Sequence, residues 1–191
     1  MKALVLDGSL SGDETLAMPR EILTAELGYR GWEVEVALLR DLQIADCSGC
    51  YSCWIATPGI CRVNDAGRDL ARKAAVCDLL IFLTPVTFGG YSSELKKAVD
   101  RLIPNILPFF EKVGGEIHHS KRYESIPGLV VIGMTASTDE ERDATFRKVV
   151  ERNATNFRSP AHAVGILGTT WAGDEVRREV GMMLAAVGVE L

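Results

Sequence analysis

Five short runs rich in Val, Ile, Leu and Ala alternate along the chain with longer stretches in which apolar positions recur at helical spacing. Within each run the apolar residues are nearly continuous, which is typical of parallel strands covered by helices on both faces. The runs are residues 3–6, 34–39, 79–83, 129–132 and 163–167. The pattern predicts an α/β fold in which a five-stranded parallel sheet lies between two layers of helices.

The stretches between the runs carry signals for helix starts. Residues 11–14, Ser-Gly-Asp-Glu, are typical of a capping box, and Pro19 is expected to kink or restart the helix that follows. A second box at 137–141 predicts a helix with an acidic first turn. The other expected helix starts are Asn64-Asp65, Ser92 or Ser93, and Gly173-Asp174.

Length and charge narrow the class of protein. The 191 residues suit a single domain spanning 1–191, interrupted by a cysteine-containing insertion at 41–63 and a long loop at 104–127. A net charge of −5 without a long basic run argues against nucleic-acid binding. No apolar stretch approaches the ~18 residues of a membrane span, and the N-terminal run is too short for a signal peptide. We therefore expect a cytoplasmic, reducing location, where structural disulfides are rare.

The loop after the first run has the composition of an anion site. It contains two glycines and three hydroxyl side chains between Asp7 and the expected helix. Backbone N–H groups, neutral side-chain donors and a helix N-terminus can together hold a phosphate. The G-x-G-x-x-G fingerprint and the Walker lysine are absent, which argues against dinucleotide, ATP and GTP sites. A Ser- and Gly-rich turn that merely caps the helix remains the alternative.

The loop after the third run contains one proline, two adjacent glycines and two aromatic residues. Gly89 and Gly90 are expected to let a flat ligand approach the backbone, because no Cβ stands in the way. Backbone N–H groups there can bond the polar edge of a ring. The alternative is an ordinary tight turn with a buried Phe88.

Together these loops indicate a family. GSLSGDET after the first run and TPVTFGGYSSELKKAVDR after the third resemble the flavodoxin-like NAD(P)H-dependent FMN reductases. With its cysteine loop, the chain more closely resembles the iron–sulfur flavoprotein branch, over roughly residues 1–135. The resemblance implies a flavodoxin-like three-layer sandwich that binds FMN. The implied FMN-binding residues are Ser9, Ser11, Asp13 and Thr15 at the phosphate, Pro85, Val86, Thr87, Phe88, Gly89 and Gly90 at the ring, and Thr135, Ala136 and Ser137 in a third loop.

Four of the five cysteines lie within one short segment. Cys47, Cys50 and Cys53 have C-x₂-C-x₂-C spacing, and the TPGI sequence before Cys61 favours a type II turn that folds the chain back. Closely spaced cysteines on irregular backbone can bind the irons of a [4Fe–4S] cluster, and the resemblance implies this cluster. A zinc site remains open, although structural zinc usually takes two separated C-x₂-C pairs. A loop that holds no metal also remains open.

The sequence therefore predicts an FMN-binding oxidoreductase or electron-transfer flavoprotein with a [4Fe–4S] cluster. No catalytic side chain is expected, because the flavin carries the chemistry, with NAD(P)H or a ferredoxin-type partner as electron donor. The alternatives are a cluster-free NAD(P)H-dependent FMN or quinone reductase, a non-enzymatic flavodoxin-type carrier, and a zinc-stabilised interaction module without flavin. The resemblance also implies a homodimer or homotetramer, with contacts expected from 104–127.

Overall fold

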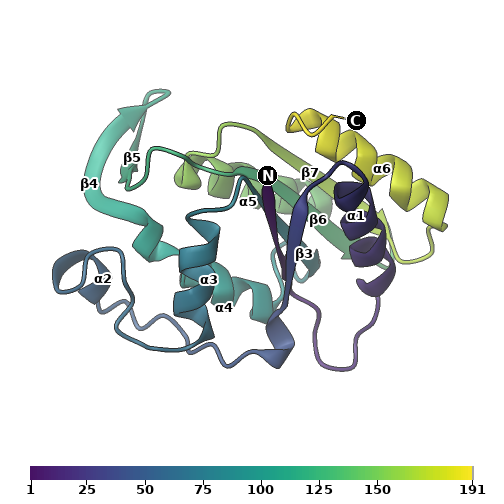
Figure 1. The fold of residues 1–191 in the computed structure, drawn as a ribbon. Helices are drawn as coiled ribbons and strands as arrows, with labels where there is room; N and C mark the ends of the chain where they lie inside the picture. The colour runs from purple at the N-terminus through teal and green to yellow at the C-terminus, as the bar shows by residue number, and fades with distance from the viewer. Residues whose placement is uncertain (191) are drawn as a thin grey trace.

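A five-stranded parallel sheet forms the centre of the molecule (Figure 1). The computed structural model describes residues 1–190 of the chain. The strand order is β2-β1-β3-β6-β7, and each neighbouring pair is parallel. Every predicted run lies in or overlaps a strand, which confirms the predicted α/β, flavodoxin-like fold. The strands are β1 (Lys2–Asp7), β2 (Glu33–Leu38), β3 (Leu79–Pro85), β6 (Gly128–Thr135) and β7 (His162–Gly168).

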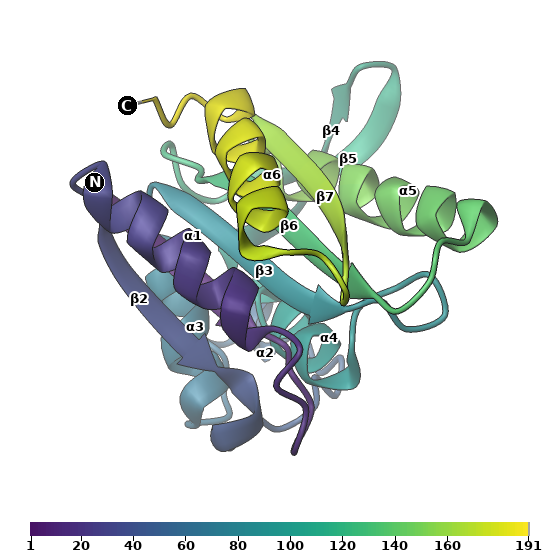
Figure 2. The same cartoon turned by 90° about the vertical axis from the view of Figure 1, so that its right-hand side faces the viewer.

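Helices cover both faces of this sheet, as the continuous apolar strands predict (Figure 2). One face packs against α1 (Ala17–Tyr29) and α6 (Gly173–Ala186). The other face packs against α3 (Ala66–Ala74), α4 (Ser93–Asp100) and α5 (Glu140–Phe157). Each fully buried Leu, Ile, Val or Phe in these two cores stabilises the fold by about 1.5–3 kcal/mol relative to exposure.

Side-chain caps define the starts of three of these helices. Asp65 accepts a hydrogen bond from the Arg68 N–H and caps α3, and Ser92 accepts one from Leu95 and caps α4, both as predicted. The cap of α5 is Asp139, two residues after the predicted Ser137. None of the helices within residues 1–190 combines the length and apolar character needed to cross a membrane.

The predicted start of α1 is wrong. The helix begins at Ala17 rather than in 11–14, and no side chain caps it. The carboxylates expected to form the box are engaged elsewhere: Asp13 accepts the Thr15 N–H at 2.9 Å and Glu14 pairs with Arg40 at 2.8 Å. Pro19 consequently lies in the first helical turn, where its missing N–H costs no helical hydrogen bond, and it produces no restart.

The two long connections contain more structure than expected. The 41–63 segment includes the one-turn helix α2 (Ser52–Ile55) after a 3₁₀ turn, η1 (Leu39–Asp41). The 104–127 segment, expected as a long loop, instead follows η2 (Ile103–Asn105) into an antiparallel hairpin. Its strands β4 (Ile106–Val113) and β5 (Glu116–Lys121) are joined by Gly114 and Gly115 and project from the body of the molecule (Figure 1).

Candidate functional site

Three of the predicted loops lie at one edge of the sheet. Strands β1, β3 and β6 are neighbours and run parallel, so their carboxyl ends meet there. The structure thereby gathers the segments 8–15, 86–90 and 135–137, each of which begins at or directly after the end of one of these strands. This edge is where open α/β sheets bind ligands.

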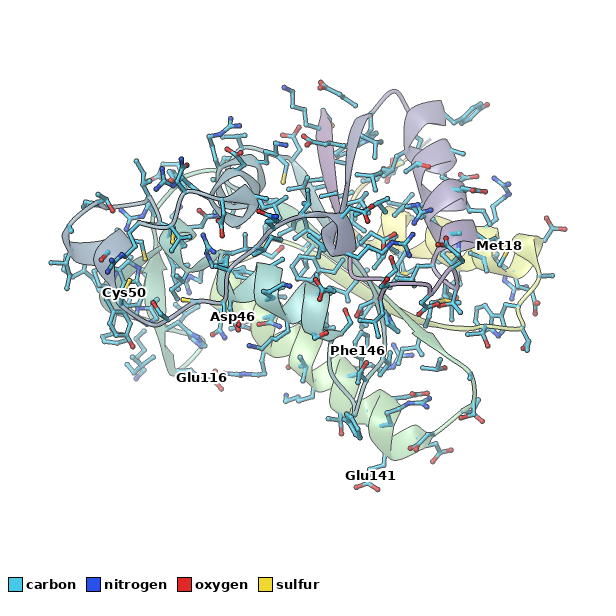
Figure 3. All side chains as sticks on the ribbon, turned by 90° about the horizontal axis from the view of Figure 1, so that it is seen from below. Met18, Asp46, Cys50, Glu116, Glu141 and Phe146 are labelled. Carbon is cyan, nitrogen blue, oxygen red and sulfur yellow. The ribbon has the colours of Figure 1, made fainter. Side chains whose placement is uncertain are left out.

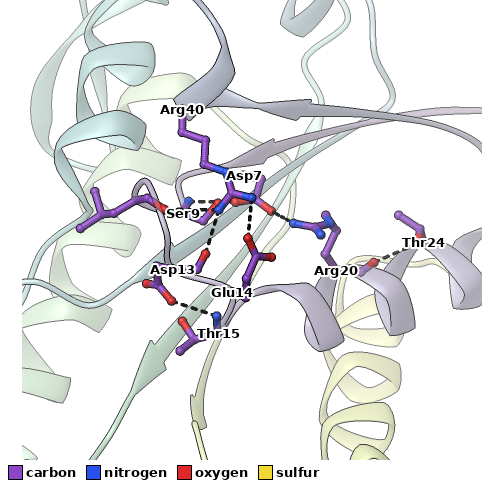
Figure 4. A network of polar contacts seen from close by, with 9 residues as sticks. Asp7, Ser9, Asp13, Glu14, Thr15, Arg20, Thr24 and Arg40 are labelled. Carbon is purple, nitrogen blue, oxygen red and sulfur yellow. Dashed lines mark hydrogen bonds and ion pairs between the residues drawn. The ribbon is translucent and has the colours of Figure 1, made fainter.

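A buried acid organises the start of the first loop (Figure 4). Asp7 is fully buried and accepts the Ser9 N–H at 2.8 Å and the Arg20 guanidinium at 2.7 Å. The Ser9 hydroxyl is buried as well and has no hydrogen-bond partner in the protein. Because an unmade hydrogen bond costs about 1–3 kcal/mol, this orphan hydroxyl fits a site completed by a ligand acceptor.

Arg40 holds the rest of the first loop in place (Figure 4). Its guanidinium donates to the carbonyls of Leu10 and Asp13, at 3.3 and 2.8 Å, and to the Glu14 carboxylate at 2.8 Å. The Glu14 hydrogen bond raises the pKa of Arg40 above its usual value. Arg40 was not predicted as a site residue. Its position just after β2, the neighbour of β1, indicates that it lies near the loop after β1.

The predicted phosphate residues differ in exposure. Ser9 is buried, whereas the side chains of Ser11 and Thr15 face solvent and Asp13 is half-buried. Because the Asp13 carboxylate accepts the Thr15 N–H, it occupies one of the amide donors that an anion would use. Asp13 therefore shapes the loop, and its carboxylate, which only accepts hydrogen bonds, offers an anion no donor.

The loop after β3 closes into a tight turn with an exposed aromatic ring. Thr87 and Gly90 exchange backbone hydrogen bonds of 3.0 and 2.8 Å. Both residues between them have positive φ, 50° for Phe88 and 75° for Gly89, as type I′ turns require. Phe88 is fully exposed rather than buried, and a bulky residue at positive φ is strained. Such strain is concentrated at functional sites.

Gly89 packs closely against α5. A Cβ on this residue would lie 2.9 Å from Thr145 Cγ2 and 3.4 Å from the Arg142 carbonyl. The missing side chain therefore lets α5 approach this turn closely. At Gly90 the nearest atom to a Cβ would be the Thr87 carbonyl at 3.6 Å, which is ordinary contact.

The third predicted segment, 135–137, follows β6. Thr135 is buried, and its carbonyl accepts the Thr169 N–H at 2.9 Å. Ala136 and Ser137 are exposed, and the Ser137 carbonyl accepts the Arg142 guanidinium at 2.6 Å. The segment is thus held by hydrogen bonds from Thr169, directly after β7, and from Arg142 of α5. Ala136 and Ser137 remain exposed to solvent.

The four clustered cysteines line a single cavity of about 50 Å³. One water needs roughly 10–15 Å³, so this cavity has room for a larger group. Cys47 and Cys50 are exposed, Cys61 is half-buried and Cys53 is buried, and all are free thiols. Figure 3 shows Cys50 at the opposite end of the molecule from Met18, which lies in the first turn of α1.

Local backbone explains why these thiols converge. The predicted turn is present: Gly59 has a φ of 82° and the Ile60 N–H donates to the Thr57 carbonyl at 2.8 Å. Hydrogen bonds from the Ser52 backbone N–H and hydroxyl lower the pKa of Cys50 to about 7. Burial, followed by the nearby Cys61, raises the pKa of Cys53.

The arrangement differs from that of a single-ion site. Within residues 1–190, no three His, Cys, Asp or Glu side chains converge in the manner that one metal ion requires. A zinc ion needs its ligands at about 2.0–2.3 Å from one point. In a [4Fe–4S] cluster each cysteine binds a different iron, so the four thiols do not converge on one point. The four free thiols around one cavity fit the second description.

Comparisons with known proteins identify the family of the chain. The profile of the family described as NADPH-dependent FMN reductase matches residues 1–159. An iron-sulfur flavoprotein of Methanocaldococcus jannaschii, MJ1083, is 35% identical over 121 residues, which are 61% of this chain and 61% of that relative. An FMN-dependent NADPH-azoreductase of Staphylococcus aureus is 33% identical over 104 residues, 53% of this chain and 52% of that protein. The match thus spans less than two thirds of either relative.

Solved structures show the same fold. An NAD(P)H:quinone oxidoreductase from Methanothermobacter marburgensis superposes with a TM-score of 0.69 over 98% of this chain and 97% of that one. An FMN-dependent NADH-azoreductase from Bacillus anthracis, solved in complex with FMN, gives 0.65 over 98% of both chains. Sequence identities are 18% and 10%, so these likenesses concern the fold alone.

Proposed function

The chain belongs to the family of NADPH-dependent FMN reductases, and from this membership we propose that it binds FMN at the carboxyl edge of its sheet and oxidises NAD(P)H. The membership confirms the predicted family and the predicted class, an FMN-dependent oxidoreductase. The observation that carries the proposal is the buried Ser9 hydroxyl, which has no partner in the protein and follows β1 at the carboxyl edge of the sheet.

The loop after β1 supplies neutral donors for the FMN phosphate. Ser9, Ser11 and Thr15 carry the hydroxyls, and the start of α1 adds backbone N–H groups. Arg40 holds the loop by donating hydrogen bonds to two of the loop's carbonyls. The positive charge of Arg40 is balanced by Glu14. In this proposal Asp13 shapes the loop, as its hydrogen bond to the Thr15 amide supports.

The loops after β3 and β6 supply the rest of the site. The exposed ring of Phe88 and the strained turn that carries it support a role in ligand contact. Gly90, unlike Gly89, keeps its α-carbon free of close packing. The residues proposed to flank the flavin ring are Pro85, Val86, Thr87, Phe88, Gly89 and Gly90, together with Thr135, Ala136 and Ser137.

Bound FMN supplies the redox chemistry, because it can accept a hydride and release electrons singly. The chain's own contribution is to bind the phosphate, orient the ring and limit the access of water. No side chain is proposed as a general acid or base. The electron donor is proposed to be NAD(P)H, in keeping with the family.

The cysteine cavity is proposed to hold a [4Fe–4S] cluster. Two observations support this: all four thiols line one cavity, and the chain is 35% identical to a protein named as an iron-sulfur flavoprotein. Cys47, Cys50, Cys53 and Cys61 would each bind one iron. The cluster would supply one-electron transfer.

A cluster-free reductase is the second candidate, and the 33% identity to an azoreductase favours it. Anaerobic absorbance spectra with iron, sulfide and zinc analysis separate the two. About four irons and four sulfides per chain are expected for the cluster. Flavin bands without iron or sulfide would support the cluster-free reductase, and stoichiometric zinc would support a zinc site.

Steady-state oxidation of NADPH and NADH, measured with FMN and a quinone acceptor, tests the enzymatic proposal. We expect sustained turnover that depends on added FMN. FMN binding without turnover would contradict it and would support a flavodoxin-type carrier. Replacing the nicotinamide with a reduced ferredoxin-type protein in this assay tests the ferredoxin as the electron donor.

A homodimer or homotetramer is proposed to form through the hairpin. Phe109, Phe110 and Ile117 are exposed on β4 and β5, with Phe109 and Phe110 on opposite faces of the hairpin, and exposed apolar side chains of this size support a contact surface. Light scattering of the wild type and of a Phe109→Ser, Phe110→Ser variant tests this. The variant is expected to have the lower mass, whereas equal masses would contradict the proposed interface.

A further inference from the structure

Arg101 is a buried cation at the C-terminal end of α4. Its side chain is 2% exposed, and burying an unpaired charge costs several kcal/mol. The guanidinium meets the Asp65 carboxylate through two hydrogen bonds of 2.7 and 2.8 Å. This paired, two-point geometry is the one that makes a buried ion pair tolerable.

The ion pair joins the two ends of the cysteine loop. Arg101 Nη1 also donates to the Ala45 carbonyl at 2.7 Å, two residues before Cys47. Asp65, four residues after Cys61, accepts the Ala45 N–H at 2.9 Å. Both stems of the loop are therefore held by one guanidinium and one carboxylate, which fixes how far apart the first and last cysteines stand.

The same side chain borders the cysteine cavity. Arg101 lines the cavity together with the four cysteines, and its guanidinium lies beside the Cys61 thiol. Its third nitrogen, Nε, is buried and has no hydrogen-bond partner in the protein. An orphan donor of this kind costs about 1–3 kcal/mol, so Arg101 keeps one N–H available to an acceptor.

We propose that Arg101 is a positioning residue for the iron–sulfur cluster, holding the stems of the cysteine loop and placing a fixed positive charge beside the Cys61 sulfur. The inference rests on the proposed function of the cysteine cavity. Four thiolates gather negative charge in one place, and the positive end of the Arg101–Asp65 pair lies beside one of them, Cys61. Reduction adds a further electron, so the cation favours the reduced cluster and makes its reduction potential less negative.

Two substitutions separate the positive charge of Arg101 from its two-point hydrogen bonding to Asp65. Arg101→Gln removes the charge, whereas Arg101→Lys keeps it and loses the two-point contact with Asp65. Arg177→Gln is the matched control, because Arg177 pairs with Glu26 at 2.6 Å on the α1 and α6 face of the sheet. Each protein is reconstituted anaerobically with iron and sulfide, analysed for both, and titrated with dithionite while the cluster signal is followed.

We expect Arg101→Gln to hold less than half the iron and sulfide of the wild type, with the remaining clusters reduced at a more negative potential. Arg101→Lys should also lose occupancy but keep a potential close to that of the wild type. The control should match the wild type in both measurements. A purely structural arginine would change the occupancy without this difference in potential.

FMN affinity reports whether each variant is folded, because the proposed FMN loops adjoin the other end of α4. Variants that lose FMN binding together with the cluster would assign Arg101 a general structural role and overturn the proposal. If the wild type binds the cluster and both Arg101 variants have the same iron and sulfide content and the same reduction potential as the wild type, this inference alone is overturned. A wild type without iron or sulfide would overturn the cluster proposal, and this inference with it.

Discussion

Ser92 donates a hydrogen bond from its hydroxyl to the Gly8 carbonyl at 2.6 Å and so ties the loop after β1 to the start of α4. Its backbone N–H donates to Thr84 Oγ1 on β3 at 2.9 Å. Gly8 is equally constrained, because a Cβ there would lie 2.7 Å from Ser92 Oγ and from Leu95 Cβ. A single buried serine therefore sets the spacing of the two loops assigned to FMN.

Replacing this serine should destabilise the protein. Ser92→Ala removes the α4 cap and leaves the buried Gly8 carbonyl without its donor, which costs about 1–3 kcal/mol of unfolding free energy. Urea denaturation measures the loss. Ser93→Ala, at an exposed neighbouring position, is the control and should change stability by less than about 0.5 kcal/mol. Equal effects of the two substitutions would refute the assigned contact.

Replacing Arg40 should weaken FMN binding through the phosphate alone. Arg40→Gln removes the charge that holds the Leu10 and Asp13 carbonyls and leaves Glu14 unpaired beside the loop. We expect FMN affinity to fall about tenfold, or about 1.4 kcal/mol, while riboflavin affinity stays unchanged. Fluorescence quenching of each flavin gives both numbers. A parallel loss for riboflavin would place Arg40 outside the phosphate site.

Substituting Gly89 with alanine should lower the free energy of unfolding far more than substituting Gly90 with alanine. Gly89→Ala forces a positive φ and a contact with Thr145, so it should cost about 2–4 kcal/mol, against about 1 kcal/mol or less for Gly90→Ala. Thermal unfolding of both variants measures the difference. Adding Thr145→Ala to Gly89→Ala should recover part of the loss. No recovery would show that packing against α5 is not the constraint.

The Asp65–Arg101 pair should stabilise the folded protein at neutral pH, and this contribution should be lost in acid. Burial alone would raise the pKa of Asp65, but hydrogen bonds from Arg101 and the Ala45 amide outweigh it and lower the pKa from 3.8 to about 2. The folded pKa lies below the unfolded one, so the stabilisation is present above about pH 4. It is lost as the pH falls through 2, and it is worth about 2 kcal/mol.

The stability difference between the wild type and Asp65→Asn tests this. The difference in unfolding free energy should be constant from pH 7 to pH 5 and should narrow as the pH falls below 4. A difference that is independent of pH down to 2.5 would contradict the assigned pKa.

The parallel core was predictable from the sequence because its strands are covered on both faces. Burial on both sides demands apolar residues at every position, as in residues 79–83, and such runs have few alternative interpretations. Helix starts at Asp65 and Ser92 were predictable for a similar reason, since each cap bonds an amide within three residues.

The errors arose where distant residues decide local structure. The box at 11–14 was a sound local signal, but Arg40, brought from the next strand, takes the Glu14 carboxylate. The hairpin was missed although its Gly114-Gly115 turn is a recognised hairpin signal between two strand-forming segments. Its strands lack the strict alternation of apolar and polar residues that would have completed the pattern.

The candidate site was predictable in outline only. The thiols and hydroxyls stand out by their spacing in the chain, whereas the cations that organise them do not. Arg101 is one of many arginines in the sequence, and only the fold brings it to Asp65 and to the cysteine cavity.

Calorimetric titration of the wild type and of Ser9→Ala with FMN and with riboflavin tests the central claim most directly. We expect one FMN per wild-type chain, FMN binding at least tenfold weaker in Ser9→Ala, and equal riboflavin affinity in the two proteins. Failure of the wild type to bind FMN, or a Ser9→Ala variant that binds it as tightly as the wild type, would contradict a phosphate site at the carboxyl end of β1.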